Sequence, residues 1–144
     1  MLEVARYSGC FVCGQKNDIG LKARFFFKDG KAVTEYTAEK RFEGYHGVFH
    51  GGITATLLDE VMIKALLAKD IYALTVELTV RFHKTVHVGQ KLKLTGRVEK
   101  SKGRLYVTSG EVTSDDGELV ATATGKYLEV KGDMKNKLLE SLET

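Results

Sequence analysis

The chain is 144 residues long, with a hydrophobic share of 43%, a charged share of 28% and a formal net charge of +3 at pH 7. This length fits one domain with one hydrophobic core, and this composition excludes a disordered chain. The basic residues are dispersed, so nothing indicates nucleic-acid binding. No apolar run approaches the roughly 20 residues that span a bilayer, and the N-terminus lacks a secretory pattern. We expect a single domain over residues 1–144, located in the cytoplasm.

The first predicted elements are two strands joined by a tight turn. The segment LKARFFFKDGKAVTEYTA, from Leu21 to Ala38, is rich in aromatic and β-branched residues on both sides of Asp29 and Gly30. An Asp-Gly pair between two such runs is a strong hairpin signal. The segment RFEGYHGVFH that follows is predicted to be a loop.

From Gly52 to Lys69 the spacing of apolar residues predicts a helix of about 17 residues with a broad apolar face. This face consists of Ile53, Leu57, Leu58, Val61, Met62, Ala65 and Leu66.

After the predicted helix, the period changes from about 3.6 to two. In YALTVELTVRF, apolar residues alternate with polar ones, which predicts a half-buried strand. Three more strands are predicted in KLKLTGRVEK, RLYVTSGEVTS and ELVATATGKYLEV, and a short amphipathic helix over about 133–142 with Asp133 as its N-cap. One long helix among antiparallel strands favours an α+β architecture in which the sheet curls around the helix.

Two adjacent acids in the predicted helix have different surroundings. Glu60 precedes Lys64 by four residues, the favourable order for a surface ion pair, so we interpret Glu60 as solvent-facing. Asp59 has apolar neighbours on the helix and no local cation. A carboxylate in such surroundings has its charged form disfavoured unless water or a cavity accepts it. Asp59 is therefore either an exposed residue or a base or nucleophile that faces a pocket.

Gly51 and Gly52 stand at the start of the helix. They either permit a sharp turn or let another molecule approach the free N–H groups, which can stabilise an oxyanion. Asp59 is eight positions beyond Gly51, or roughly 12 Å along a helix axis, too far for one acyl carbon to touch both. Two antiparallel copies related by a two-fold axis could bring them together, so a chemical site implies at least a dimer.

The two cysteines, Cys10 and Cys13, form a C-x-x-C motif that could be structural, half of a metal site or redox-active. His83 and His87 do not complete a zinc-finger pattern, because the gap between the two pairs is too long. In a strand, four residues also span roughly 13 Å, too far for two ligands of one ion.

Two segments resemble motifs of a known family. The segment HGGITATLLDE, residues 50–60, resembles the H-G-G-x-x-x-x-x-x-D-[EN] signature of hotdog-fold acyl-CoA thioesterases, in the branch that includes the phenylacetate-pathway enzymes. CFVCGQKNDIGL, residues 10–21, resembles the C-x-x-C-G-x-x-N-x-x-G-[LM] opening of many members of that group. The resemblance implies a hotdog fold, in which an antiparallel sheet wraps around one long helix, and hydrolysis of an acyl-CoA to a free acid and coenzyme A.

The resemblance also implies roles for five residues. Asp59 would attack the thioester carbonyl or activate water toward it, and the amide of Gly51, with help from Gly52, would polarise that carbonyl from the neighbouring subunit. His50 would shape the loop and contact the thioester, and Thr75 would orient the water. The regular alternation of the strand nevertheless puts Thr75 on the face away from the helix, unless the pleat begins after it.

For coenzyme A, the resemblance implies phosphate contacts near the dimer edge, and Arg81, Lys84, Lys102 and Arg104 are candidates as basic residues near strand ends. Implied partners are an acyl-CoA substrate and further copies of the chain, as a homodimer or a dimer of dimers (a homotetramer). We expect no nucleic acid, membrane, metal or separate cofactor to take part.

Three functions are compatible with this fold. Hydrolysis of a thioester makes use of Asp59, whereas a non-catalytic acyl-CoA sensor, the alternative, needs no carboxylate beside the thioester. A hydratase would need an Asp and His pair on one helix, which the chain lacks. The sequence leaves open which acyl group is bound, and whether Asp59 is a nucleophile or a general base.

Overall fold

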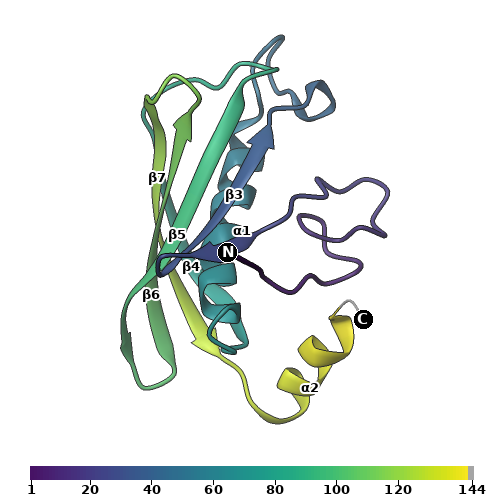
Figure 1. Cartoon of the computed structure of the whole chain (residues 1–144), viewed down its shortest axis with the longest axis vertical. Helices are drawn as coiled ribbons and strands as arrows, with labels where there is room; N and C mark the ends of the chain where they lie inside the picture. Colours follow the sequence, from purple (N-terminus) through teal and green to yellow (C-terminus); the bar gives the residue numbers. More distant parts are fainter. Residues whose placement is uncertain (143–144) are drawn as a thin grey trace.

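A seven-stranded antiparallel sheet curves around one long helix in this computed structural model, which describes residues 1–142 (Figure 1). Across the sheet the strands are β1 (Leu2–Glu3), β2 (Phe26–Lys28), β3 (Lys31–Thr37), β5 (Lys91–Lys102), β6 (Leu105–Ser114), β7 (Leu119–Glu129) and β4 (Ala73–Phe82). The helices are α1 (Gly51–Leu67), the 3-10 turn η1 (Lys40–Phe42) and α2 (Gly132–Ser141). The predicted α+β architecture is confirmed.

Most predicted elements form, with differences at their ends. Asp29 and Gly30 both have positive φ, 53° and 78°, as the two-residue turn between β2 and β3 requires. The first strand of that hairpin begins only at Phe26, because residues 4–25 form a loop along α1. The predicted N-cap of the second helix is wrong, because Lys131 caps α2 and Asp133 lies in its first turn. Residues 143 and 144 of the predicted domain lie outside the described residues.

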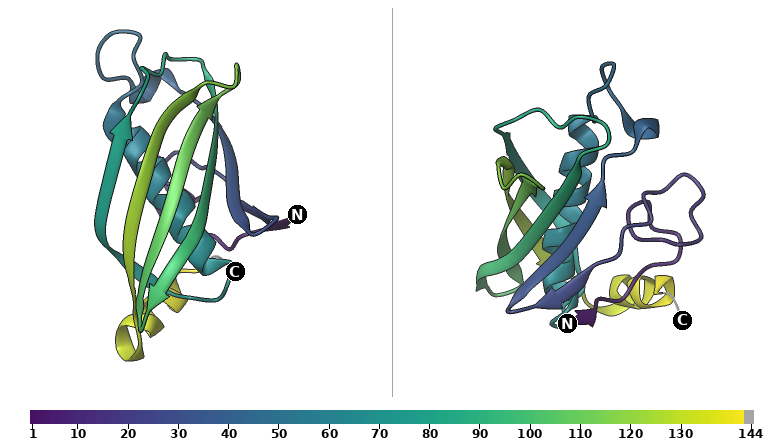
Figure 2. Two further views of the ribbon diagram at one scale, coloured as in Figure 1. Left: turned by 90° about the vertical axis from the view of Figure 1, so that its left-hand side faces the viewer. Right: turned by 45° about the horizontal axis from the view of Figure 1, so that its top comes forward.

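The helix α1 rests on a row of small residues that crosses four strands. Ala32, Gly96, Gly110 and Ala123 are direct neighbours on β3, β5, β6 and β7. A Cβ atom on Gly96 would lie 2.6 Å from the carbonyl oxygen of Val61 in α1. The helix backbone therefore lies almost directly on the sheet, crossing behind the strands as Figure 2 (left) shows.

The N-terminal loop covers the side of α1 that the sheet leaves open, and α2 lies beside this loop, on the right in Figure 1. The loop is anchored by backbone hydrogen bonds, among them Val4 N to Phe25 O (2.8 Å) and Ala23 N to Val12 O (2.9 Å). No helix within residues 1–142 has both the length and the apolar character needed to cross a membrane.

The interpretation of Glu60 as a solvent-facing residue is wrong. Glu60 and Lys64 do pair, with 3.6 Å between Oε2 and Nζ, but Lys64 is fully buried and the Glu60 side chain is only 13% exposed. The N-terminal loop, which local periodicity does not take into account, covers both. Burial, followed by the negative charge of Cys10, raises the pKa of Glu60 to about 7.

We expect Gly96→Ala to lower the free energy of unfolding by about 1–3 kcal/mol, because the added methyl group would push α1 off the sheet. Urea denaturation followed by circular dichroism would measure this. Gly9→Ala is the matched control, since a Cβ there meets nothing within 4 Å and should change stability by less than about 1 kcal/mol. Equal stabilities of the two variants would show that the close helix–sheet contact matters little.

Candidate functional site

The carboxylate of Asp59 projects from the middle of α1 toward the sheet, where two hydroxyl groups hold it. Thr75 Oγ1 on β4 donates to Oδ1 at 3.0 Å and lies 3.3 Å from Oδ2. Tyr127 Oη on β7 donates to Oδ1 at 2.8 Å. Thr75 and Tyr127 are paired neighbours on adjacent strands, so the two donors come from one spot on the sheet. The carboxylate is half-buried, and Oδ2 has fewer partners than Oδ1.

A β-bulge brings Thr75 to the helix side of the sheet. The β4–β7 register shifts between Thr75 and Glu77, so Val76 has no paired partner on β7. Without the shift, Thr75 would face away from Leu78 and Val80, which pack against the core. The extra residue puts all three on the α1 side. Thr75 therefore reaches Asp59, as the resemblance implies, although the sequence alternation argues against it.

Tyr127 is a site residue that the sequence analysis missed, although its strand was predicted. The side chain is fully buried. Burial, followed by the charge of Asp59, raises the pKa of Tyr127 well above its usual value, so the phenol stays protonated and donates. A Cβ atom on Gly125 would lie 2.5 Å from the Tyr127 ring. The G-x-Y pattern at residues 125–127 is therefore the sequence signal for a large ring packed over its own strand.

The N-terminus of α1 presents one free amide. His50 is the N-cap, and its Nδ1 accepts from the Gly52 N–H at 2.8 Å, so the proton of the neutral ring is on Nε2. The Gly52 amide is therefore already used within the chain. The Gly51 amide finds no acceptor among the described residues. It remains available to a ligand at the positive end of the helix dipole.

Gly51 borders a cleft of about 1070 Å³ between the loop before α1 and the end of β4. His50, Gly52, Phe82 and Lys84 also line this cleft, whereas Asp59 and Thr75 do not. The structure thus brings Asp59 together with Thr75, and His50 with Gly51 and Gly52, as two separate groups in one chain.

The basic candidates for phosphate contacts do not form one cluster. Lys84 lines the cleft and forms an ion pair with Glu118. Arg81 is exposed near the same end of β4. Arg104 lies in the β5–β6 turn, where its carbonyl accepts from Glu129 N, next to the opposite end of β4.

Strand β4 forms one edge of the sheet, with β7 on its other side (Figure 2, left). Three of its apolar side chains are largely exposed: Leu74 (42%), Val76 (59%) and Phe82 (52%). An edge strand of ten residues with exposed apolar side chains is a surface that readily pairs with another strand.

Comparison with known proteins gives consistent matches. The family model of the Thioesterase superfamily matches residues 46–121. Human acyl-coenzyme A thioesterase 13 is 30% identical over 95 residues, which are 64% of this chain and 68% of that protein. Among solved structures, the thioesterase superfamily protein RHA08564 is 27% identical with a TM-score of 0.78, covering 83% of this chain and 62% of that one.

The Escherichia coli PaaI protein from the phenylacetic acid degradation operon shares the fold. It is 24% identical with a TM-score of 0.71, covering 76% of this chain and 84% of that one. The predictions of a hotdog fold and, at the level of the family, of a thioester hydrolase are confirmed. Both the sequence match around α1 and the helix-wrapping sheet lead to one assignment: the chain belongs to the thioesterase superfamily.

Proposed function

We propose that this protein hydrolyses acyl-CoA thioesters to a free acid and coenzyme A, with Asp59 as the group that activates the attacking water. The observation that carries the proposal is the pair of hydroxyl donors on Asp59 Oδ1. They hold the carboxylate in one orientation and leave Oδ2 as the oxygen that can take a proton. The human relative's name, an acyl-coenzyme A thioesterase, supports the substrate class.

In the proposed reaction, a water bound by Asp59 attacks the thioester carbonyl carbon and gives its proton to the carboxylate. The Gly51 N–H stabilises the negative charge that develops on the carbonyl oxygen. The tetrahedral intermediate then collapses, the carbon–sulfur bond breaks, and the coenzyme A thiolate takes the proton from Asp59. Thr75 and Tyr127 are positioning residues, and Thr75 also stands close enough to orient the water.

The proposed site combines residues of two protomers. Thr75, near one end of β4, touches Asp59, whereas Phe82, at the other end, packs near Gly51, within 3.6 Å of a Cβ placed there. If two copies of β4 pair in antiparallel fashion around a two-fold axis, the Thr75 end of one strand meets the Phe82 end of its copy. Asp59 would then face the Gly51 amide of the second protomer, and exposed apolar β4 side chains would be buried. On this basis we propose a homodimer or dimer of dimers; a cytoplasmic location is proposed from the sequence alone.

Lys84 is the best-supported of the phosphate-binding candidates. It lines the same cleft as Gly51, so its ammonium can attract the phosphates of coenzyme A while the thioester reaches the helix N-terminus. Arg81 would assist from the same end of β4. Arg104 could contribute only from the other protomer, since it lies at the opposite end of the sheet.

Asp59→Asn should lower kcat by about 10²–10⁴-fold, because the amide cannot accept the proton of water. Release of free thiol across a panel of acyl-CoA substrates would measure this. Asp29→Asn makes the same chemical change in the β2–β3 turn, where Asn also tolerates positive φ, and should leave the rate unchanged. Equal rates for wild type and Asp59→Asn would remove Asp59 from the mechanism. No thiol release from any thioester by the wild type would favour a sensor.

Thr75→Val and Tyr127→Phe should each lower kcat by about 10–100-fold with little change in KM, since each removes one hydrogen bond to a charged carboxylate. Steady-state kinetics with the best acyl-CoA of the panel would test this. A rise in KM at constant kcat would instead mean that these hydroxyls bind the acyl group.

Gly51→Pro should lower kcat by about 10²–10³-fold. Proline removes the N–H but suits the first position of a helix, and the extended backbone of His50 (ψ 126°) is compatible with a following proline. Gly51→Ala keeps the N–H and meets only ordinary contacts with Phe82, so it should retain activity. Equal loss in both variants would argue against an oxyanion role for this amide.

Mixing the two inactive variants tests the shared site. A hybrid dimer of Asp59→Asn with Gly51→Pro contains one intact site, so random reassortment should restore about a quarter of the wild-type activity. Recovery should be absent if both groups act within one protomer.

A further inference from the structure

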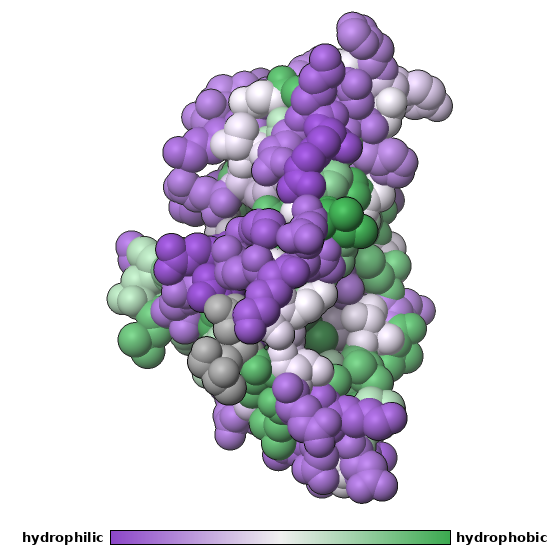
Figure 3. All heavy atoms as spheres, turned by 90° about the vertical axis from the view of Figure 1, so that its right-hand side faces the viewer, coloured by the Kyte–Doolittle hydropathy of each residue, from purple (hydrophilic) through white to green (hydrophobic). Residues whose placement is uncertain are grey.

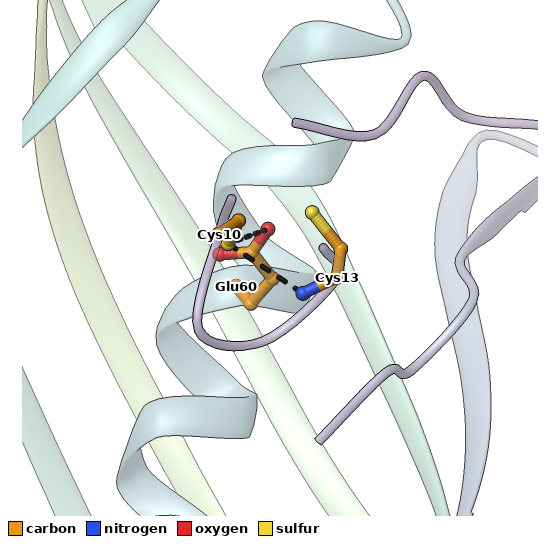
Figure 4. A group of neighbouring side chains, drawn as sticks. All are labelled: Cys10, Cys13 and Glu60. Atoms are coloured by element: carbon orange, nitrogen blue, oxygen red, sulfur yellow. Dashed lines mark hydrogen bonds between the residues drawn. The ribbon is translucent and has the colours of Figure 1, made fainter. Parts of the chain in front are cut away.

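A second cluster of reactive side chains lies outside the proposed thioester site. Cys10 and Cys13 of the N-terminal loop meet Glu60 of α1, and the three ligand atoms lie within 4.8 Å of one another (Figure 4). Among the described residues, this is the one group of three His, Cys, Asp or Glu side chains close enough to hold an ion. The histidines His83 and His87 are not part of it.

Each sulfur atom receives two N–H groups. Cys10 Sγ accepts from the backbone of Val12 (3.3 Å) and Cys13 (3.5 Å), whereas Cys13 Sγ accepts from Tyr7 N (3.5 Å) and Lys64 Nζ (3.3 Å). A metal-bound thiolate sulfur accepts N–H hydrogen bonds of this kind. Hydrogen bonds of this kind also orient metal ligands from outside.

The loop is built so that both sulfur atoms face the helix. The N–H of Gly14 bonds to Cys10 O at 2.9 Å, closing the turn. A Cβ atom on Gly14 would lie 2.5 Å from the backbone N and O of Cys10, so only glycine fits after the second cysteine. The turn is therefore held in one shape by packing.

Charge balance also favours a divalent cation. Lys64 is fully buried, with Nζ 2.5 Å from Ala5 O and 3.6 Å from Glu60 Oε2. In the metal-binding form, two thiolates and one carboxylate beside one ammonium carry two negative units in total. A bound divalent ion would make the cluster neutral.

We propose that Cys10, Cys13 and Glu60 bind one Zn²⁺ ion that ties the N-terminal loop to α1, with Lys64 as an outer hydrogen-bond donor. Two thiolates and a carboxylate suit zinc in chemistry and number. Sulfur and oxygen ligands of a tetrahedral zinc are about 3.5 Å apart, close to the 3.8 Å between Cys10 Sγ and Glu60 Oε2.

Cys10 and Glu60 also border a cavity of about 450 Å³ between the loop, α1 and α2. Figure 3 shows apolar atoms on this face between the hydrophilic surfaces of the loop and of α2. The cavity leaves room for water, or a small ligand, as the fourth ligand of the ion. This site is separate from Asp59, for which no metal is expected.

The test is a titration of the metal-free, reduced full-length chain with Co²⁺, a spectroscopic substitute for Zn²⁺. We expect one Co²⁺ per chain with thiolate-to-metal charge-transfer absorption, displaced by one equivalent of Zn²⁺. Cys13→Ser should lose about half of this absorption. It should also bind Co²⁺ on the order of 100-fold more weakly, because loss of a ligand should weaken binding at least as much as loss of a residue that only hydrogen-bonds to a ligand. Glu60→Gln should weaken binding similarly while keeping the absorption of both thiolates.

Lys64→Met distinguishes an outer donor from a ligand, because it should weaken binding by about 10–100-fold without loss of charge-transfer intensity. The double variant His83→Ala, His87→Ala is the matched control and should bind Co²⁺ like wild type. Circular dichroism would check folding, and Cys10→Ser would replace Cys13→Ser if that variant were unfolded. The absence of charge-transfer absorption in reduced wild type, or wild-type affinity in Glu60→Gln, would overturn the proposal.

Discussion

Close contact between α1 and the sheet is the constraint on which the rest of the structure depends. Gly96 lets the helix backbone at Val61 and Met62 lie directly against the sheet, and its neighbour Gly110 leaves room for the side chains of Met62 and Leu58. Contact at this level fixes both the height of the helix and its rotation about its own axis, since interiors are too densely packed to allow alternatives. The direction of every side chain of α1 follows from it.

The fixed rotation gives two adjacent acids different environments. Successive residues of a helix point about 100° apart, so Asp59 faces β4 and β7 while Glu60 faces the N-terminal loop. Asp59 meets two hydroxyl groups, and its Oδ2 has fewer hydrogen-bond partners than Oδ1. Glu60 meets sulfur and a buried ammonium, and burial raises its pKa. One helical step thus separates a site suited to hydrolysis from one suited to holding a cation.

Strand β4 connects the two ends of the proposed active site. Its bulge turns Thr75 toward Asp59, and its far end brings Phe82 beside Gly51. Its outer edge has exposed apolar side chains, which a monomer would leave in water. A two-fold axis at this edge would bury the exposed apolar side chains of β4. It would also bring Asp59 of one protomer beside Gly51 of the other.

The sequence by itself determined the order and type of the main elements, because hydrophobic periodicity and the Asp-Gly turn are local signals. It also singled out Gly51 and Asp59, since a glycine-rich helix start and a carboxylate without a local cation can be recognised from neighbours along the chain, whereas the role of His50 came only from the family resemblance. Its motifs resembled those of the family to which the chain belongs. Predictions from local sequence patterns were wrong or absent for residues whose environment depends on tertiary contacts.

Only the tertiary structure decided the three features that complete the sites. The bulge that redirects Thr75 depends on pairing with β7, and the donation from Tyr127 joins residues 68 positions apart. The burial of Glu60 depends on a loop 50 positions away from it, whose cysteines had no visible third partner in the sequence. Each of these contacts joins segments that are distant along the chain, and periodicity reports only which face of an element is apolar, not what comes to cover it.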